Sequence, residues 1–187
     1  MTVIETPRLR LRRFHDDDAE RLVELANHPE ISHMLGSMPH PYMLKHALEF
    51  LDSISDLSDG AEQFAITLKN KAGTLIGSIG YGPPTAQGKS LDETDFGYWI
   101  GMDYWGQGYA SEAARAVIAY GFEETGLDAI DTEYLTINPA SGKVLGKLGF
   151  IRIGERTVHS CGSGERKPSI HVRLTRDMYL SQKAHAL

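Results

Sequence analysis

Glycines and small residues dominate one stretch of the chain, residues 101–113, which reads Gly-Met-Asp-Tyr-Trp-Gly-Gln-Gly-Tyr-Ala-Ser-Glu-Ala. The stretch precedes the clearest helical pattern in the sequence. A helix start exposes unpaired N–H groups and the positive end of the helix dipole, and both suit phosphate. Gly106 and Gly108 would let the backbone approach an anion closely, because no Cβ intervenes. The stretch therefore predicts either an anion-binding turn or a plain strand-to-helix turn whose glycines only avoid strain.

Hydrogen bonds to a charged group are worth about 1.5–3 kcal/mol each, so four or five N–H groups on a diphosphate would anchor a large cofactor. A dinucleotide-binding fingerprint fits poorly. It requires Gly or Ala where this chain has Ser111, and here the turn follows expected antiparallel strands in the middle of the chain.

Periodicity places this turn in a mixed arrangement of helices and strands. Residues 8–14 alternate polar and apolar side chains, which predicts a strand with one buried face. The acidic residues 16–18 suit the start of the helix that follows. Further strands are expected at 63–68, 74–81, 94–100, 130–137, 150–157 and 169–174, and further helices at 47–54, 109–125 and 140–148. This order indicates a mixed α/β (α+β) single domain over residues 1–180, with residues 181–187 as a flexible tail.

Composition narrows the function classes. The 187 residues include 19 Lys plus Arg and 25 Asp plus Glu, so the net charge of −6 argues against a nucleic-acid binder. Eight dispersed histidines and a single cysteine predict no metal site and allow no internal disulfide. Cys161 near His159 is more often incidental than a covalent nucleophile. The chain shows neither a signal segment nor an apolar run of membrane-spanning length, so a cytoplasmic protein is expected.

Four segments together carry a family resemblance. They are the opening Thr-Pro-Arg-Leu-Arg-Leu-Arg-Arg at 6–13, Asp-Phe-Gly-Tyr-Trp-Ile at 95–100, Trp-Gly-Gln-Gly-Tyr-Ala at 105–110, and Asn-Pro-Ala-Ser at 138–141 followed by Lys-Leu-Gly-Phe at 147–150. The chain resembles the GCN5-related N-acetyltransferases (GNAT), particularly the branch that acetylates ribosomal-protein N-termini (RimJ/RimL-like). The family's cofactor signature is Arg/Gln-x-x-Gly-x-Gly/Ala, and Trp105 departs from its first position.

The resemblance implies a central, mostly antiparallel twisted sheet of about six to seven strands, flanked by about four helices. One strand pair, 94–100 and 130–137, would splay apart and admit the pantetheine arm of acetyl-CoA, the only cofactor expected. A backbone N–H near Tyr98 would polarise the thioester carbonyl. The implied cofactor-binding residues are Tyr98, Trp99, Ile100, Gly106, Gln107, Gly108, Tyr109, Ala110, Ser111, Asn138 and Ser141.

Direct acetyl transfer to an amine needs a proton acceptor for the amine and a proton for the leaving thiolate. Asp95 is the first candidate for the proton acceptor and Glu93 the second, although either could be a solvated carboxylate, and water is the alternative. Ser141 is the candidate for the thiol end. Many acetyltransferases place a tyrosine acid on this helix, but Leu145 occupies the corresponding position.

The acceptor amine is less constrained. At pH 7, deprotonating an α-amine costs on the order of 1 kcal/mol and a lysine amine about 4–5 kcal/mol, which favours a protein N-terminus. A small amine such as an aminoglycoside or polyamine is the alternative substrate, and a CoA-binding regulatory protein without catalysis is the alternative function. His33, His40 and Tyr42 would line the acceptor cleft or lie on the surface. The oligomeric state, including a homodimer, stays open, and no nucleic-acid or membrane partner is expected.

Overall fold

One sheet organises the protein. The computed structural model describes residues 2–55, 57, 60–71, 73–83, 94–161 and 163–185. Within these ranges the strands follow the order β1-β2-β3-β4-β5-β6-β8-β7, and every neighbouring pair is antiparallel except β5 and β6. The strands are β1 Ile4–Glu5, β2 Leu9–Arg12, β3 Glu62–Leu68, β4 Leu75–Gly82, β5 Asp95–Ile100, β6 Ala129–Leu135, β7 Ile151–His159 and β8 Arg166–Thr175.

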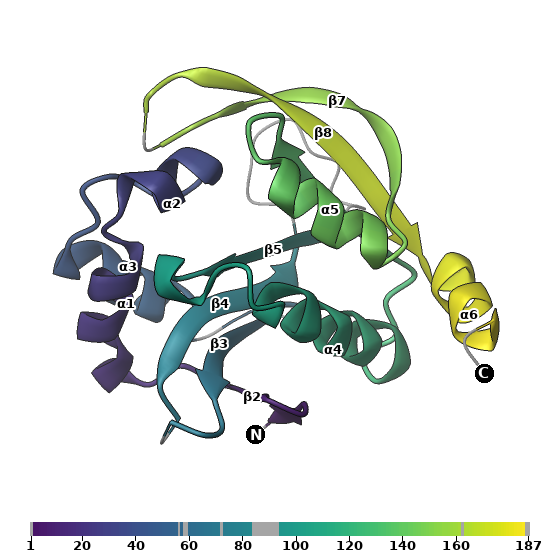
Figure 1. Ribbon diagram of the computed structural model, residues 1–187, viewed down its shortest axis with the longest axis horizontal. Helices are drawn as coiled ribbons and strands as arrows, with labels where there is room; N and C mark the ends of the chain where they lie inside the picture. Colours follow the sequence, from purple (N-terminus) through teal and green to yellow (C-terminus); the bar gives the residue numbers. More distant parts are fainter. Residues whose placement is uncertain are drawn as a thin grey trace.

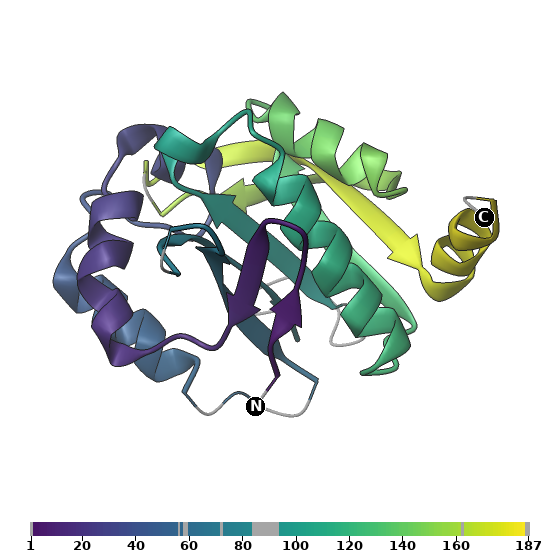
Figure 2. The ribbon, with the colours of Figure 1, turned by 60° about the horizontal axis from the view of Figure 1, so that its bottom comes forward.

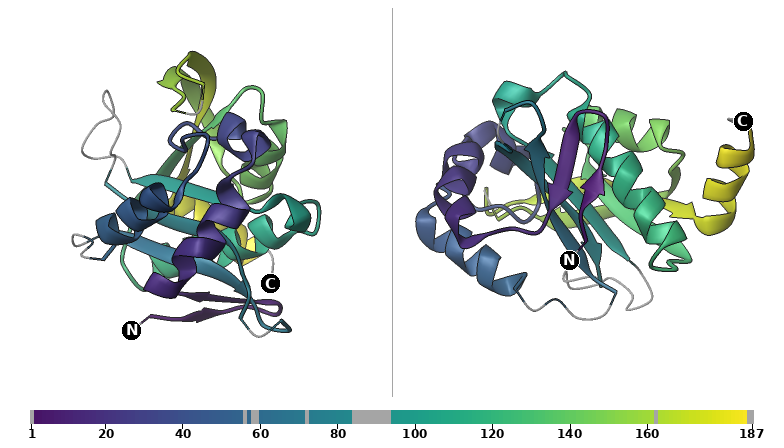
Figure 3. Two further views of the ribbon diagram at one scale, coloured as in Figure 1. Left: turned by 90° about the vertical axis from the view of Figure 1, so that its left-hand side faces the viewer. Right: turned by 90° about the horizontal axis from the view of Figure 1, so that it is seen from below.

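Helices lie on both faces of the sheet (Figure 1, Figure 3). Two of them, α4 and α5, cover one face, and α1 to α3 group on the other. The long β7–β8 hairpin reaches α2 at its tip, and α6 follows β8 at the far end (Figure 1). The helices are α1 Ala19–Ala26, α2 Pro29–Met34, α3 Leu44–Ser53, α4 Tyr109–Glu123, α5 Pro139–Lys147 and α6 Arg176–His185.

Alternating strand residues build two apolar layers, because successive side chains point to opposite faces of a sheet. On β3, Phe64 packs in the α4 layer and Ala65 in the α1–α3 layer. On β5, Tyr98 packs with the α4 layer and Trp99 with the other. Burial at about 25 cal/mol per Å² of apolar surface makes both layers favourable and fixes which side chain of β5 faces which helices.

The mixed α/β fold expected from the sequence is confirmed, with eight strands in the described part of the chain. Three elements were not expected: β1 has two residues, α2 has six, and α6 has no buried residue. Such elements are too short or too polar for hydrophobic periodicity to reveal. Residues 181–185, assigned above to a tail, belong to α6, where Lys183 Nζ lies 2.6 Å from Glu123 Oε1.

Candidate functional site

The parallel strands β5 and β6 are joined at one end only. Asp95 and Asp131 are register partners, and the Asp131 N–H donates to the Thr94 carbonyl at 2.8 Å. Thr132 Oγ1 then donates to the Phe96 carbonyl at 2.5 Å. Beyond that point no register partner joins the described residues of the two strands. The β6-facing edge of β5 over residues 97–100 therefore offers backbone groups to a ligand, since unpaired groups inside a sheet are costly.

The glycine-rich turn follows β5 at the open end of this strand pair. Gly106 and Gly108 have positive φ values of 73° and 80°, which glycine adopts without strain. Gly108 is the N-cap of α4, and no side chain among the described residues caps the start of this helix. A Cβ built on Gly106 would meet nothing within 4 Å. The first-turn N–H groups of α4 therefore face an open approach, a geometry that fits an anion.

Trp105 ties this turn to the end of β5. Its indole Nε1 donates to the Ile100 carbonyl at 2.6 Å, while about half of the side chain stays exposed. The tryptophan that departs from the family signature therefore holds the turn beside the strand that borders the opening.

A pair of hydroxyls spans the opening on the α4–α5 side. The Tyr98 hydroxyl of β5 lies 3.0 Å from Ser141 Oγ in the first turn of α5. Burial raises the pKa of Tyr98 to about 12, against a smaller lowering by the hydrogen bond with Ser141. Leu145, one turn further along α5, is buried in the core. The sequence placed only the backbone of Tyr98 in the site, so the role of its hydroxyl is a finding of the structure.

Asn138 positions Ser141. It is the N-cap of α5, and its Oδ1 accepts the Ser141 N–H at 3.1 Å. Its Nδ2 donates to the Met34 carbonyl at 3.4 Å. Asn138 therefore links the start of α5 to α2, and holding pantetheine stays a prediction for this residue.

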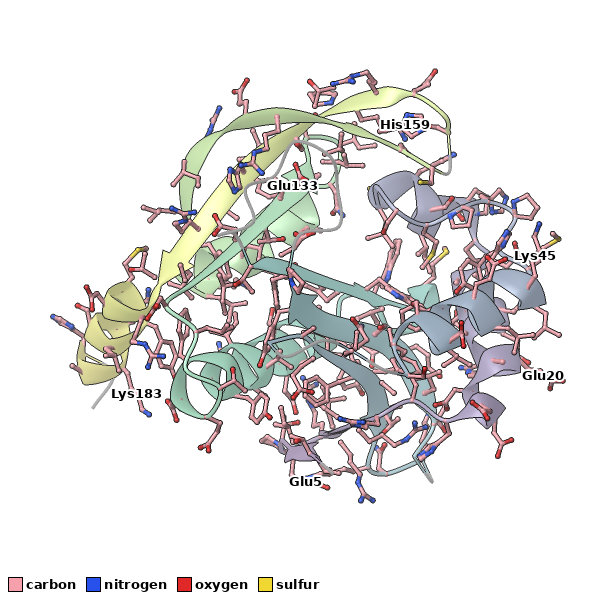
Figure 4. All side chains as sticks on the ribbon, turned by 180° about the vertical axis from the view of Figure 1, so that it is seen from behind. Glu5, Glu20, Lys45, Glu133, His159 and Lys183 are labelled. Atoms are coloured by element: carbon pink, nitrogen blue, oxygen red, sulfur yellow. The ribbon has the colours of Figure 1, made fainter. Side chains whose placement is uncertain are left out.

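The carboxylates lie on the opposite face. Asp95 is at the closed end of the strand pair, three residues and therefore about 10 Å of strand from Tyr98. The structure does not bring it together with Ser141, and Glu93 lies outside the described residues. Glu133 is two residues beyond Asp131 on β6 and shares its face, and its Oε2 accepts from Ser169 Oγ at 2.7 Å. Figure 4 shows Glu133 on β6 beneath the β7–β8 hairpin.

Glu133 was not among the site residues expected from the sequence. The available signal was an acidic residue within the expected strand 130–137, five positions before Asn138. Propensity alone did not single it out, because a polar residue in a strand usually marks a solvent-facing position.

A buried ionic cluster supports β6 next to Glu133. Arg173 donates to both oxygens of Asp131, at 2.9 and 3.0 Å, and His171 Nε2 lies 3.1 Å from Asp131 Oδ1. The Asp131 side chain is 4% exposed. A buried carboxylate is tolerated only when it is paired in this way, so the cluster fixes β6 against β8.

The end of α2 and the residues just after it contact the β7–β8 hairpin. The Cys161 N–H, at the hairpin tip, donates to the Gly36 carbonyl at 2.8 Å, and Lys167 Nζ donates to the His33 carbonyl at 3.4 Å. His33 and His40 are exposed, whereas Tyr42 is buried in the α1–α3 core with its pKa raised to about 12, mainly by burial. Tyr42 is therefore not a surface residue, and its place in an acceptor cleft stays a prediction.

No described helix has the length and apolar character needed to cross a membrane. Among residues whose placement is described, no three His, Cys, Asp or Glu side chains form a group that could hold a metal ion.

Comparison with known proteins decides the family. Residues 8–151 match the acetyltransferase (GNAT) domain. The chain belongs to the GNAT acetyltransferase family. An uncharacterized N-acetyltransferase of Bacillus subtilis, YoaA, is 31% identical over 163 residues, covering 81% of this chain and 84% of that protein. The FsC-acetyl coenzyme A-N(2)-transacetylase of Aspergillus fumigatus is 29% identical, covering 80% of this chain and 65% of that protein.

Solved structures share the fold of this GNAT acetyltransferase. Ribosomal-protein-S5-alanine acetyltransferase from Vibrio fischeri superposes with a TM-score of 0.78 at 22% identity, covering 96% of this chain and 99% of that one. Spermidine N-acetyltransferase from Vibrio cholerae, in complex with CoA and spermine, superposes with a TM-score of 0.75 at 18% identity, covering 94% and 99%. These likenesses concern the fold and span both protein and small-molecule acetyltransferases.

Proposed function

We propose that this acetyltransferase moves the acetyl group of acetyl-CoA directly to a primary amine, and that the acceptor is a protein N-terminal α-amine. The observation that carries the proposal is the one-ended β5–β6 pair, bordered by the uncapped start of α4 and by the Tyr98–Ser141 hydroxyl pair. One opening is thus bordered by a candidate anchor for the cofactor, by an open strand edge and by two hydroxyls that could donate a proton.

The chain's own groups would divide the work of binding. N–H groups from Gly106 to Ser111 would hold the diphosphate, with help from the α4 dipole. The free edge of β5 would pair with pantetheine amides. A backbone N–H between Tyr98 and Ile100 would donate to the thioester oxygen as charge develops on it.

Proton transfer would use both faces of the opening. Glu133, on the face away from α5, would accept the proton of the attacking amine, directly or through water. Tyr98 and Ser141, on the α5 face, would donate toward the leaving thiolate, since a tyrosine with a pKa of about 12 keeps its proton at neutral pH. The amine would then lose its proton on one face of the opening and the thiolate would receive a proton on the other. The two proton transfers would therefore not compete for the same protein group.

The choice of an α-amine rests on proton energetics. An α-amine needs only about 1 kcal/mol to lose its proton at pH 7, against about 4–5 kcal/mol for a lysine amine, so the α-amine is the easier acceptor for an enzyme without a strong base. The likeness to the ribosomal-protein-S5-alanine acetyltransferase supports this choice. The likeness to the spermidine enzyme supports a polyamine as the second candidate.

Thiol release from acetyl-CoA, measured against a panel of acceptors, tests the proposal. The panel comprises peptides beginning with Ala or Ser, the same peptides with a blocked N-terminus and one internal lysine, spermidine, and an aminoglycoside. We expect turnover with the free N-termini, with mass spectrometry placing the acetyl group on the α-amine. Turnover confined to spermidine or the aminoglycoside would reassign the acceptor, and CoA binding without turnover on any acceptor would indicate a regulatory protein.

A further inference from the structure

The first position of the cofactor signature lacks its usual polar side chain in this protein. The family carries Arg or Gln there, whereas this chain carries Trp105, whose indole is already bonded to the Ile100 carbonyl. An indole offers one N–H donor and no charge. A side chain that donates to an anion at the glycine turn would therefore have to come from elsewhere in the chain.

Arg8 supplies a guanidinium at that place. It lies in the turn between β1 and β2, and Figure 2 shows this hairpin beside α4. Its Nη1 donates to the Gln107 carbonyl at 2.9 Å, within the glycine turn itself. Its Cζ lies 4.5 Å from the centroid of the Tyr109 ring, in the first turn of α4. Two segments about a hundred residues apart are thus joined at the start of α4.

Glu112 holds this guanidinium in place. Arg8 Nε donates to Glu112 Oε2 at 2.6 Å, and the Arg8 backbone N–H donates to Oε1 at 2.9 Å. Thr6 Oγ1 also donates to Oε1, at 2.6 Å. Burial alone would raise the pKa of Glu112, but the hydrogen bonds from Thr6 and Arg8 outweigh it and hold the pKa below its ordinary value. Glu112 is therefore ionised near neutral pH and orients Arg8 with several bonds.

One arm of the guanidinium remains available. Nε and Nη1 are used as described, whereas no hydrogen bond among the described residues involves Nη2. Nη2 lies 3.5 Å from the position of a Cβ built on Gly108, the N-cap of α4. The Arg8 side chain is 47% exposed, so solvent and ligands reach it. The free arm thus stands beside the N–H groups that face the open approach.

We propose that Arg8 is a phosphate ligand of the cofactor site, with Nη2 donating to a diphosphate oxygen of CoA held at the start of α4. A guanidinium matches phosphate geometry and keeps its charge at all physiological pH values. The inference rests on the proposed cofactor site. It assigns to the β1–β2 turn a side-chain donor that position 105 does not supply.

Calorimetric titration of CoA into Arg8→Gln tests the assignment. Loss of one charge-assisted hydrogen bond should weaken CoA binding about ten- to a hundred-fold, and Arg8→Lys should recover part of the loss. The matched control is Arg10→Gln on β2, where Arg10 pairs with Glu5 at 3.4 Å and is 56% exposed; its affinity should equal that of the wild type. Unchanged affinity in Arg8→Gln would overturn the assignment, whereas a wild type that binds no CoA would overturn the proposed function.

Glu112→Gln separates a ligand from a structural support. It weakens the same Arg8–Glu112 contact but keeps the guanidinium, so CoA affinity should stay within about threefold of the wild type. An equal loss in Glu112→Gln and Arg8→Gln would show that Arg8 acts only by shaping the turn. Turnover of S-acetylpantetheine, which has no diphosphate, should be unaffected by Arg8→Gln, and a fall equal to that seen with acetyl-CoA would also contradict a phosphate contact.

Discussion

The Tyr98 hydroxyl and the Ser141 hydroxyl lie 3.0 Å apart and join the strand on one side of the β5–β6 opening to the helix on the other. Asn138 fixes one partner through the Ser141 N–H, and the apolar layer under α4 surrounds the other. Because burial keeps Tyr98 protonated, the pair can pass a proton toward a group placed between the strands. The two hydroxyls are therefore expected to act as one unit.

Removing either hydroxyl should slow the chemical step. Tyr98→Phe and Ser141→Ala are each expected to lower kcat about a hundred-fold or more, the usual contribution of a positioned proton donor. The Kd for CoA, measured by calorimetry, should change little. The double variant should be no slower than the worse single variant, since residues that act as a unit are not additive. Rate losses that multiply would contradict a shared role.

Gly108→Asp should abolish CoA binding. An aspartate at a φ of 80° strains the backbone and places a negative charge at the start of α4, where the dipole and N–H groups favour anions. Gly126→Asp is the matched control, because Gly126 has a φ of 79° at the other end of α4. Both variants should lose thermal stability, but only Gly108→Asp should lose CoA affinity by calorimetry. Equal affinities would refute the position of the diphosphate.

Two carboxylates can be ranked as proton acceptors. Glu133→Gln should lower kcat/KM about a hundred-fold or more. Asp95→Asn, at the closed end of the strand pair, should change kcat/KM far less and act mainly on stability. Steady-state kinetics from pH 6 to 9 with the acceptor found in the panel provide the comparison. A larger loss in Asp95→Asn would restore the preference for Asp95 inferred from the sequence.

Asp18 should make stability depend on acid pH. Arg12 donates to both its oxygens, at 2.7 and 2.8 Å, and the His15 N–H donates at 2.8 Å. Burial alone would raise the pKa of Asp18, but these bonds lower it below its ordinary value of 3.8. The stabilisation is therefore present above about pH 4 and lost as pH falls through the lower folded-state pKa.

Urea unfolding of Asp18→Asn measures the contribution of the ionised Asp18 carboxylate to the free energy of unfolding. The variant should be less stable by about 2–3 kcal/mol at pH 7, because Arg12 loses a largely buried partner. The difference should shrink toward zero below pH 4 as the wild-type carboxyl becomes protonated. Asp17→Asn, at an exposed neighbour, should unfold like the wild type throughout. If the wild type and Asp18→Asn still differed in unfolding free energy at low pH, the ionic origin of the stabilisation would be contradicted.

Much of the fold followed from local pattern. Alternation in 8–14 found β2, and helical spacing in 109–125 found α4, because both elements bury one face against a common sheet. The six-residue α2 begins at Pro29 and offers too few turns for periodicity. The polar α6 depends on contacts such as that between Lys183 and Glu123, which form only when distant segments meet.

The candidate site could likewise be predicted only where its features are local in the sequence. Gly106 and Gly108 could be predicted, because helix starts and glycine conformations are local properties. The placement of Glu133 opposite the Tyr98–Ser141 pair, and of Arg8 on the Gln107 carbonyl, depends on strand order and register. Sequence spacing carries no information about contacts between residues 8 and 107. Only the assembled sheet brings them together.

Competition among three amine acceptors in one reaction tests the central proposal most directly. An alanine-starting peptide and its N-terminally blocked counterpart with one lysine are mixed in equal amounts with spermidine, acetyl-CoA and the enzyme at pH 7, and the products are resolved by mass spectrometry. We predict that the acetyl group accumulates on the α-amine of the alanine peptide, and that Glu133→Gln slows this product. Preferential acetylation of lysine or spermidine would contradict the account.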